Sequence, residues 1–178
     1  MTQRLIEMLK GFRRDEEGSS TIEFSIYFTV FFFILAATVE MGYMNLRHAL
    51  LERGVDLATR EIRLNTGVIP TYEEVRQKIC DEAVIVDGCT ENLRLEMVQV
   101  DPRNFTAIPL VADCINAEED PRPVRNFVPG LDNQLMLLRA CLKYKPAMPT
   151  TSFGMALPKD PQGYAQLVAT SAFVQEPR

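Results

Sequence analysis

The feature that most constrains this chain is one long apolar run near its N-terminal end. Residues 22–41 read IEFSIYFTVFFFILAATVEM. A helix rises about 1.5 Å per residue, so a run of this length covers about 30 Å, the thickness of a bilayer's hydrocarbon core. A buried core helix can also be apolar all round, but the rest of the 178 residues offers little material to surround one. The run therefore predicts a transmembrane helix.

A cleaved secretory signal peptide is the alternative interpretation of this run. The run is longer than the apolar region of such peptides, and no A-x-A site closes it, so we expect it to be retained. We expect Glu40, Asn45 and Arg47 to mark the far boundary, where the chain returns to water. The predicted parts are a leader at 1–18, a transmembrane segment at 19–45 and a soluble domain at 46–178.

All four cysteines, Cys80, Cys89, Cys114 and Cys141, follow the apolar run. No pair has C-x-x-C spacing and His48 is the single histidine, so the pattern does not indicate a zinc site. An even number of cysteines beyond a membrane anchor favours two disulfides, with four reduced cysteines in a cytosolic core as the alternative. Three pairings are possible. We favour Cys80–Cys89 with Cys114–Cys141, because the first pair is close in sequence.

The predicted orientation depends on the cysteines more than on charge. Disulfides form in the periplasm rather than in the cytoplasm, so we expect a cytoplasmic N-terminus and a periplasmic domain on a bacterial inner membrane. The positive-inside rule separates the two sides only weakly. Basic residues lie before the run at Arg4, Lys10, Arg13 and Arg14, and after it at Arg47, Arg53 and Arg60.

The entry to the apolar run holds an unusual carboxylate, Glu23. A carboxylate inside the edge of a membrane helix is costly and is normally explained by a partner, although headgroup solvation alone can account for it. If the chain were cut between Gly18 and Ser19, the new amino group of Ser19 would lie about one helical turn from Glu23. In a bundle of such helices, the carboxylate of one helix could neutralise the amine of its neighbour, which would favour one stagger of packing.

This entry resembles the prepilin leader of type IV pilins, in which a membrane peptidase cuts after glycine and glutamate is the fifth mature residue. The acidic residues 15–17 depart from that pattern. More narrowly, residues 10–64 resemble the TadE-like family of the tight-adherence (Tad/Flp) pilus system. The resemblance rests on these stretches: FRRD at 12–15, Gly18, IEF at 22–24, EMGY at 40–43 and VDLATR at 55–60. It implies a minor pilin or pseudopilin whose partners are other pilins, Tad assembly proteins and the prepilin peptidase.

The periodicity beyond the run predicts an α+β fold. We expect one helix from about Ser20 to Leu64, with a stripe of Leu46, Leu50, Leu57 and Leu64 facing the domain's own sheet or, alternatively, a neighbouring subunit. This long helix, transmembrane and then amphipathic, would pack on a small antiparallel sheet in a pilin-like arrangement. Predicted strands occupy residues 93–99, 134–144 and 164–174, and predicted loops occupy 101–133 and 146–161.

Two local patterns refine this expectation. Thr71 and Glu74 form a capping box that starts a second helix, whose buried stripe is Val75, Ile79 and Ala83. In the first strand, Leu93, Leu95, Met97 and Gln99 alternate with more polar positions and should form its buried face.

The sequence contains no motif that would indicate an enzyme. It lacks a phosphate-binding glycine loop, an H-E-x-x-H zinc motif and a G-x-S-x-G elbow. The net charge of -5 and the absence of a basic cluster argue against nucleic acid. We therefore expect no catalytic residue, metal or cofactor. Three functions stay open: a minor pilin or pseudopilin, a membrane-anchored assembly factor of the same machine, and a periplasmic binding module with no pilus role.

Overall fold

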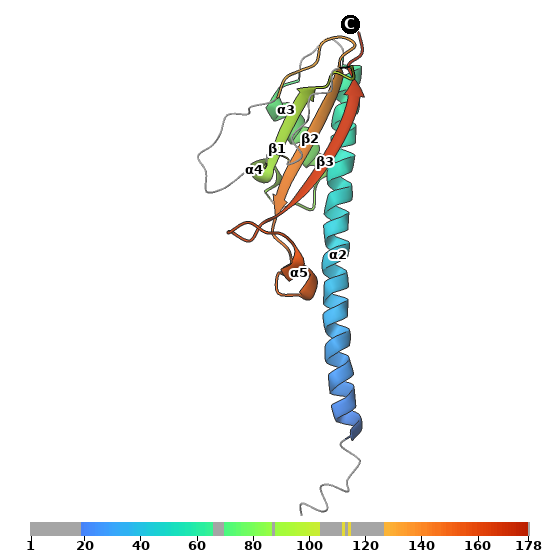
Figure 1. Ribbon diagram of the computed structural model, residues 1–178, viewed down its shortest axis with the longest axis vertical. Helices are drawn as coiled ribbons and strands as arrows, with labels where there is room; N and C mark the ends of the chain where they lie inside the picture. The colour runs from blue at the N-terminus through green and yellow to red at the C-terminus, as the bar shows by residue number, and fades with distance from the viewer. Residues whose placement is uncertain are drawn as a thin grey trace, which may run out of the picture.

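The computed structural model describes residues 19–65, 70–86, 88–103, 112, 114 and 127–177. One long helix carries a small α+β head on its C-terminal half (Figure 1). Gly18 and the rest of the predicted leader lie outside the described residues, as does Gly67.

The long helix α2 runs from Ser19 to Leu64 and contains 46 residues, or about 69 Å at the ordinary helical rise. This confirms the single continuous helix that the sequence predicts. Along Ser20–Leu35 every side chain is exposed, whereas beyond Ala36 one face is buried. The helix therefore divides into an apolar free half and a half that packs against the head.

The buried face of the second half is not the predicted one. Leu46 and Leu64 are exposed, and Leu50 and Leu57 are only partly buried. The residues of this segment that pack into the core form a neighbouring stripe: Leu51, Val55, Ala58 and Ile62. The amphipathic segment carries two apolar stripes, and periodicity alone did not decide which one meets the head.

The sheet has three antiparallel strands in the order β1-β2-β3. Strand β1 spans Leu93–Gln99, β2 spans Leu135–Tyr144 and β3 spans Ala165–Val174, each within one residue of its prediction. Leu93, Leu95 and Met97 point into the core as expected, but Gln99 is exposed, because the end of the strand has no apolar layer to cover it.

Two further elements complete the core. Helix α3 (Tyr72–Glu82) begins at the predicted capping box of Thr71 and Glu74, and it buries Val75 and Ile79. A Cβ added at Gly54 of α2 would lie 2.8 Å from the carbonyl oxygen of Ile79, so glycine permits the close approach of these helices. A short helix α4 spans Cys89–Asn92.

The predicted loop at 146–161 contains a short helix that the sequence analysis missed, α5 (Ser152–Ala156). It lies beside α2 below the sheet, at the level where the free half of the helix begins (Figure 1). The side chain of Thr151 caps it by accepting the N–H of Gly154 at 3.0 Å. A Cβ at Gly154 would lie 2.3 Å from the carbonyl oxygen of Met148, so this turn requires glycine.

Candidate functional site

The free half of α2 is the first part of the candidate site. Within the described residues, α2 is the one helix long and apolar enough to cross a bilayer. Its exposed surface is dense in aromatic residues, with Phe24, Phe28 and Phe32 stacked at intervals of four residues. Such a helix is consistent with single-pass anchoring.

Ser19 is the first residue of α2, and Glu23 lies one turn further on. The Glu23 side chain is exposed, and among the residues that the structure describes it has no hydrogen-bonding or charged partner. The structure therefore leaves Glu23 available, at the end of the helix remote from the head.

Glu40 forms the second part of the site and is not where the sequence placed it. We expected Glu40 to mark the boundary where the chain returns to water, and the structure shows that this residue is enclosed by its own protein, with 1% exposed. The carboxylate accepts hydrogen bonds from the backbone N–H groups of Ala147, at 3.1 Å, and Met148, at 2.6 Å. A buried carboxylate needs such donors, because an unpaired buried charge is strongly destabilising.

Arg47 is the companion of Glu40, two turns further along the same face of α2. Arg47, which we also expected at this boundary, is 9% exposed. Its guanidinium lies 4.2 Å from the ring centroid of Tyr43 and 4.9 Å from that of Tyr144, and its Nη1 donates to the carbonyl oxygen of Lys145 at 3.1 Å. Delocalised arginine suits such a stacked, weakly hydrated position.

Tyr144 connects the two charged residues to the sheet. Burial raises the pKa of its hydroxyl, the positive charge of Arg47 acts in the opposite direction, and the negative charge of Glu40 adds to the increase. The net effect is a raised pKa, so the phenol stays neutral.

Glu40, Arg47 and the chain from Tyr144 to Met148 form what we call the junction. It fastens the base of the head to α2. A signal for half of it was present in the sequence, because Glu40, Tyr43 and Arg47 recur on one helical face. Their partners are about a hundred residues away, and no local pattern indicates them.

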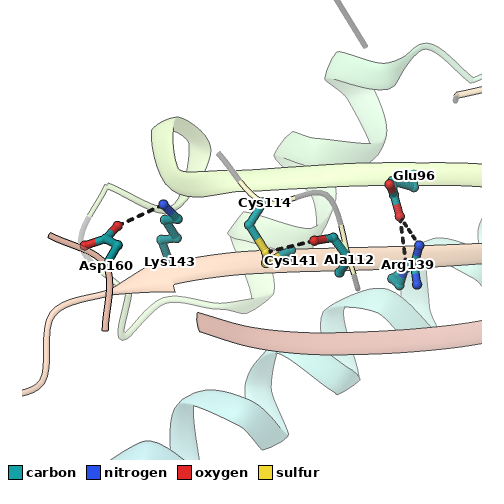
Figure 2. Close-up of a disulfide and its surroundings, with 7 residues drawn as sticks. All are labelled: Glu96, Ala112, Cys114, Arg139, Cys141, Lys143 and Asp160. Atoms are coloured by element: carbon teal, nitrogen blue, oxygen red, sulfur yellow. Dashed lines mark hydrogen bonds and ion pairs between the residues drawn. A yellow bond between two sulfur atoms is a disulfide. The ribbon is translucent and has the colours of Figure 1, made fainter. Parts of the chain in front are cut away.

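Two disulfides brace the head, in the pairing that the sequence favoured. Cys80 of α3 is bonded to Cys89 of α4, and Cys114 is bonded to Cys141 of β2. The second bond lies on the outer face of the sheet, beside ion pairs of Arg139 with Glu96 and of Lys143 with Asp160 (Figure 2).

Asp160 is a well-supported carboxylate near the end of the predicted loop. Burial alone would raise its pKa, but a hydrogen bond from Lys143, hydrogen bonds from the backbone N–H groups of Tyr164 and Gln162, and the charge of Lys143 outweigh it. The pKa of Asp160 is therefore lowered. The Nζ of Lys143 lies 2.9 Å from its Oδ2.

His48 is the remaining polar residue that the sequence singled out. His48 lies 3.2 Å from the carbonyl oxygen of Val168 and 3.8 Å from Glu52, on a partly exposed face between α2 and β3. In the part of the chain that the structure describes, no group of three His, Cys, Asp or Glu side chains is arranged to hold a metal ion.

The fold and the site define a class of protein: an α+β head fastened to one half of a long helix, whose other half is apolar, exposed and able to span a membrane. Residues 18–60 match the family model described as TadE-like protein. Neither the search of curated proteins nor that of solved structures returned a significant match.

The matched segment covers part of the site. It includes Gly18, Glu23, Glu40 and Arg47, whereas the chain from Tyr144 to Met148 that receives the last two lies outside it. The family match therefore describes the long helix, and the fold of the head comes from the structure.

Proposed function

We propose that this protein is a minor pilin or pseudopilin of a Tad pilus system, inserted in the bacterial inner membrane and contributing to pilus assembly or adhesion. The single observation that carries the proposal is the division of α2 into a free apolar half and a half packed on the head. An exposed apolar surface of this size needs a bilayer or the helices of neighbouring subunits around it. The TadE-like match over the same segment supports it.

The proposed topology has a cytoplasmic N-terminus and a periplasmic head. Two disulfides in the head support it, because such bonds form and persist in oxidising compartments. On this topology the leader 1–18 is cytoplasmic, the segment 19–45 carries the membrane span and residues 46–178 are periplasmic.

The proposed partners are other pilins, Tad assembly proteins and, as the processing enzyme, a prepilin peptidase that cuts between Gly18 and Ser19. The free carboxylate of Glu23 supports a role toward a neighbour, since its own chain gives it no partner among the described residues. In a helix bundle it would compensate the new amino group of an adjacent Ser19.

N-terminal sequencing of protein purified from membranes tests the processing step. We expect the wild type to begin at Ser19 and Gly18→Val to keep its leader and to migrate more slowly on a gel. Gly42→Val is the matched control, because a Cβ at Gly42 meets nothing within 4 Å. If the wild-type protein still begins at Met1, the leader is not cleaved and the proposed processing step is wrong.

Mass spectrometry of sheared pili tests the role itself. We expect peptides of the head in purified filaments. Their absence despite normal expression would favour a membrane-anchored assembly factor of the same machine. Normal piliation of a deletion strain would instead favour a periplasmic binding module.

A further inference from the structure

The free part of α2 is short for a complete membrane crossing. Sixteen residues, from Phe24 to Val39, lie between the two carboxylates of Glu23 and Glu40. At the helical rise they cover about 24 Å. A typical hydrocarbon core is about 30 Å thick. If this stretch were the whole span, the bilayer would have to become thinner around it.

The junction lengthens the part of α2 that can cross the membrane, because it buries the charged side chain of Glu40 inside the protein. Its carboxylate faces the backbone of residues 147–148 and not its surroundings. The next charged side chain along α2, Arg47, is also buried. With both charges covered, the helix meets no exposed polar side chain from residue 39 until Asn45. The stretch from Phe24 to Tyr43 covers about 30 Å, which matches the hydrocarbon core.

The segment that covers Glu40 is itself suited to lipid. We call residues 145–158, with α5, the foot. Its tip exposes Met155, which is 65% accessible, and Met148, and α5 also carries the partly exposed Phe153. Ala36, one turn before Glu40 on the same helical face, is 7% exposed, although every residue from Ser20 to Leu35 is exposed. The foot therefore covers α2 at a depth that the apolar run assigns to the membrane.

Part of the backbone of the foot is hydrogen-bonded within the protein, which lowers the cost of contact with lipid. The N–H groups of Met155 and Leu157 donate to the carbonyl oxygens of Thr151 and Phe153. The Thr151 hydroxyl donates to the carbonyl oxygen of Met148 at 2.9 Å, and the Nζ of Lys159 donates to that of Gly154 at 2.6 Å.

Tyrosine and lysine side chains gather where the foot joins the head. The partly exposed Tyr43 lies over the guanidinium of Arg47, and the Nζ of the exposed Lys145 lies 5.0 Å from the ring centroid of Tyr164. Tyrosines and lysines are enriched at the headgroup level, where a ring or a long stem can be apolar while the polar end stays wet.

We propose that the foot inserts into the outer leaflet of the bilayer beside α2 and sets the depth at which the head stands on the membrane. This inference rests on the proposed membrane anchorage. The proposed occupant of the exposed side chains of Met155 and Ala156 is lipid, because α5 lies against α2 at the level where the apolar free half of that helix begins (Figure 1).

The chain contains no tryptophan, so a single introduced tryptophan reports one position. The protein is reconstituted at full length into phosphatidylethanolamine and phosphatidylglycerol vesicles that contain phospholipids brominated at shallow or deep positions of the acyl chain. Met155→Trp reports the foot, Phe32→Trp reports the free helix, and Val84→Trp reports the head at a site that is 80% exposed.

We expect the emission of Met155→Trp to shift to the blue and to lose intensity with shallow bromines more than with deep ones. Phe32→Trp should lose intensity with deep bromines, and Val84→Trp should lose none. If Met155→Trp does not fold, Ala156→Trp on the same helix gives the same measurement, since Ala156 is also exposed.

The two control variants distinguish a failure of the inference about the foot from a failure of the proposed membrane anchorage. If Phe32→Trp is quenched while Met155→Trp behaves like Val84→Trp, the foot stands clear of lipid and the inference is overturned, although the anchorage holds. If Phe32→Trp is not quenched at all, the membrane anchorage itself fails, and the foot fails with it.

Discussion

The carboxylate of Glu40 accepts a hydrogen bond from the backbone N–H of Met148, 108 residues later in the chain, at 2.6 Å. This bond, with that from Ala147, fixes the foot to the long helix at the base of the head. A helix that carries a head on one half and is free on the other half transmits force to the head only if the helix and the head are firmly joined. The junction is that connection in the described structure.

Replacing Glu40 tests the junction. Glu40→Ala leaves two part-buried N–H groups without their acceptors, and a fully buried unsatisfied group would cost about 1–3 kcal/mol. We expect a lower free energy of unfolding in urea and faster proteolysis within residues 145–158. Glu40→Gln keeps one acceptor oxygen, so its loss should be smaller. Equal stability of all three proteins would show that the two bonds contribute nothing.

Arg47 should not tolerate lysine. An ammonium cannot stack between Tyr43 and Tyr144 as a planar guanidinium does, so Arg47→Lys should cost about 1 kcal/mol of unfolding free energy. Arg60→Lys is the matched control on an exposed face of the same helix, and it should stay within about 0.5 kcal/mol of the wild type. Indistinguishable urea midpoints for the two variants would contradict the stacking.

The ion pair of Lys143 with Asp160 should make stability depend on pH in the acid range. Because the pKa of Asp160 is lowered in the folded protein, its contribution is present above the ordinary carboxyl pKa of about 3.9 and is lost as the pH falls through the lower folded value. We expect the stability difference between wild type and Asp160→Asn to shrink as the pH decreases from 6 toward 3 (about the range set by those pKa values). Parallel curves over this range would contradict the assignment.

The two disulfides should contribute unequally. Cys114 and Cys141 are separated by 27 positions and Cys80 and Cys89 by 9. Loop-closure entropy then predicts losses of about 3.5 and about 2.5 kcal/mol for the respective double alanine variants. Urea unfolding of both variants under non-reducing conditions shows which variant loses more unfolding free energy. A larger loss for the shorter loop would show that chain entropy does not dominate.

Glu23→Ala should separate insertion from assembly. The variant removes a charge from an apolar helix, so membrane insertion should be intact. If Glu23 compensates the amino group of a neighbour, the amount of protein in sheared pili should fall. Glu61→Ala, an exposed carboxylate at the head end of α2, is the control. Normal incorporation of Glu23→Ala would remove the charge-pairing proposal.

Local patterns predicted most of the fold. The apolar run and its continuation predicted α2, alternation predicted the first strand, and the capping box at Thr71 predicted the start of α3. Runs of apolar and β-branched residues predicted the other two strands. These signals are local because helical and strand periods and caps involve residues a few positions apart. Helix α5 escaped notice because its five residues lie among prolines and are too few to show a period.

By itself, the sequence determined that this chain has one long helix with an apolar first half, an α+β head, and a carboxylate near the helix start. Tertiary structure decided which stripe of α2 is buried, with Leu51 and Val55 chosen over Leu46 and Leu64. It also decided that Glu40 and Arg47 are enclosed. Burial depends on partners, and those partners come from residues 144–148, whose meeting with α2 is set by how the sheet packs rather than by any neighbouring residue.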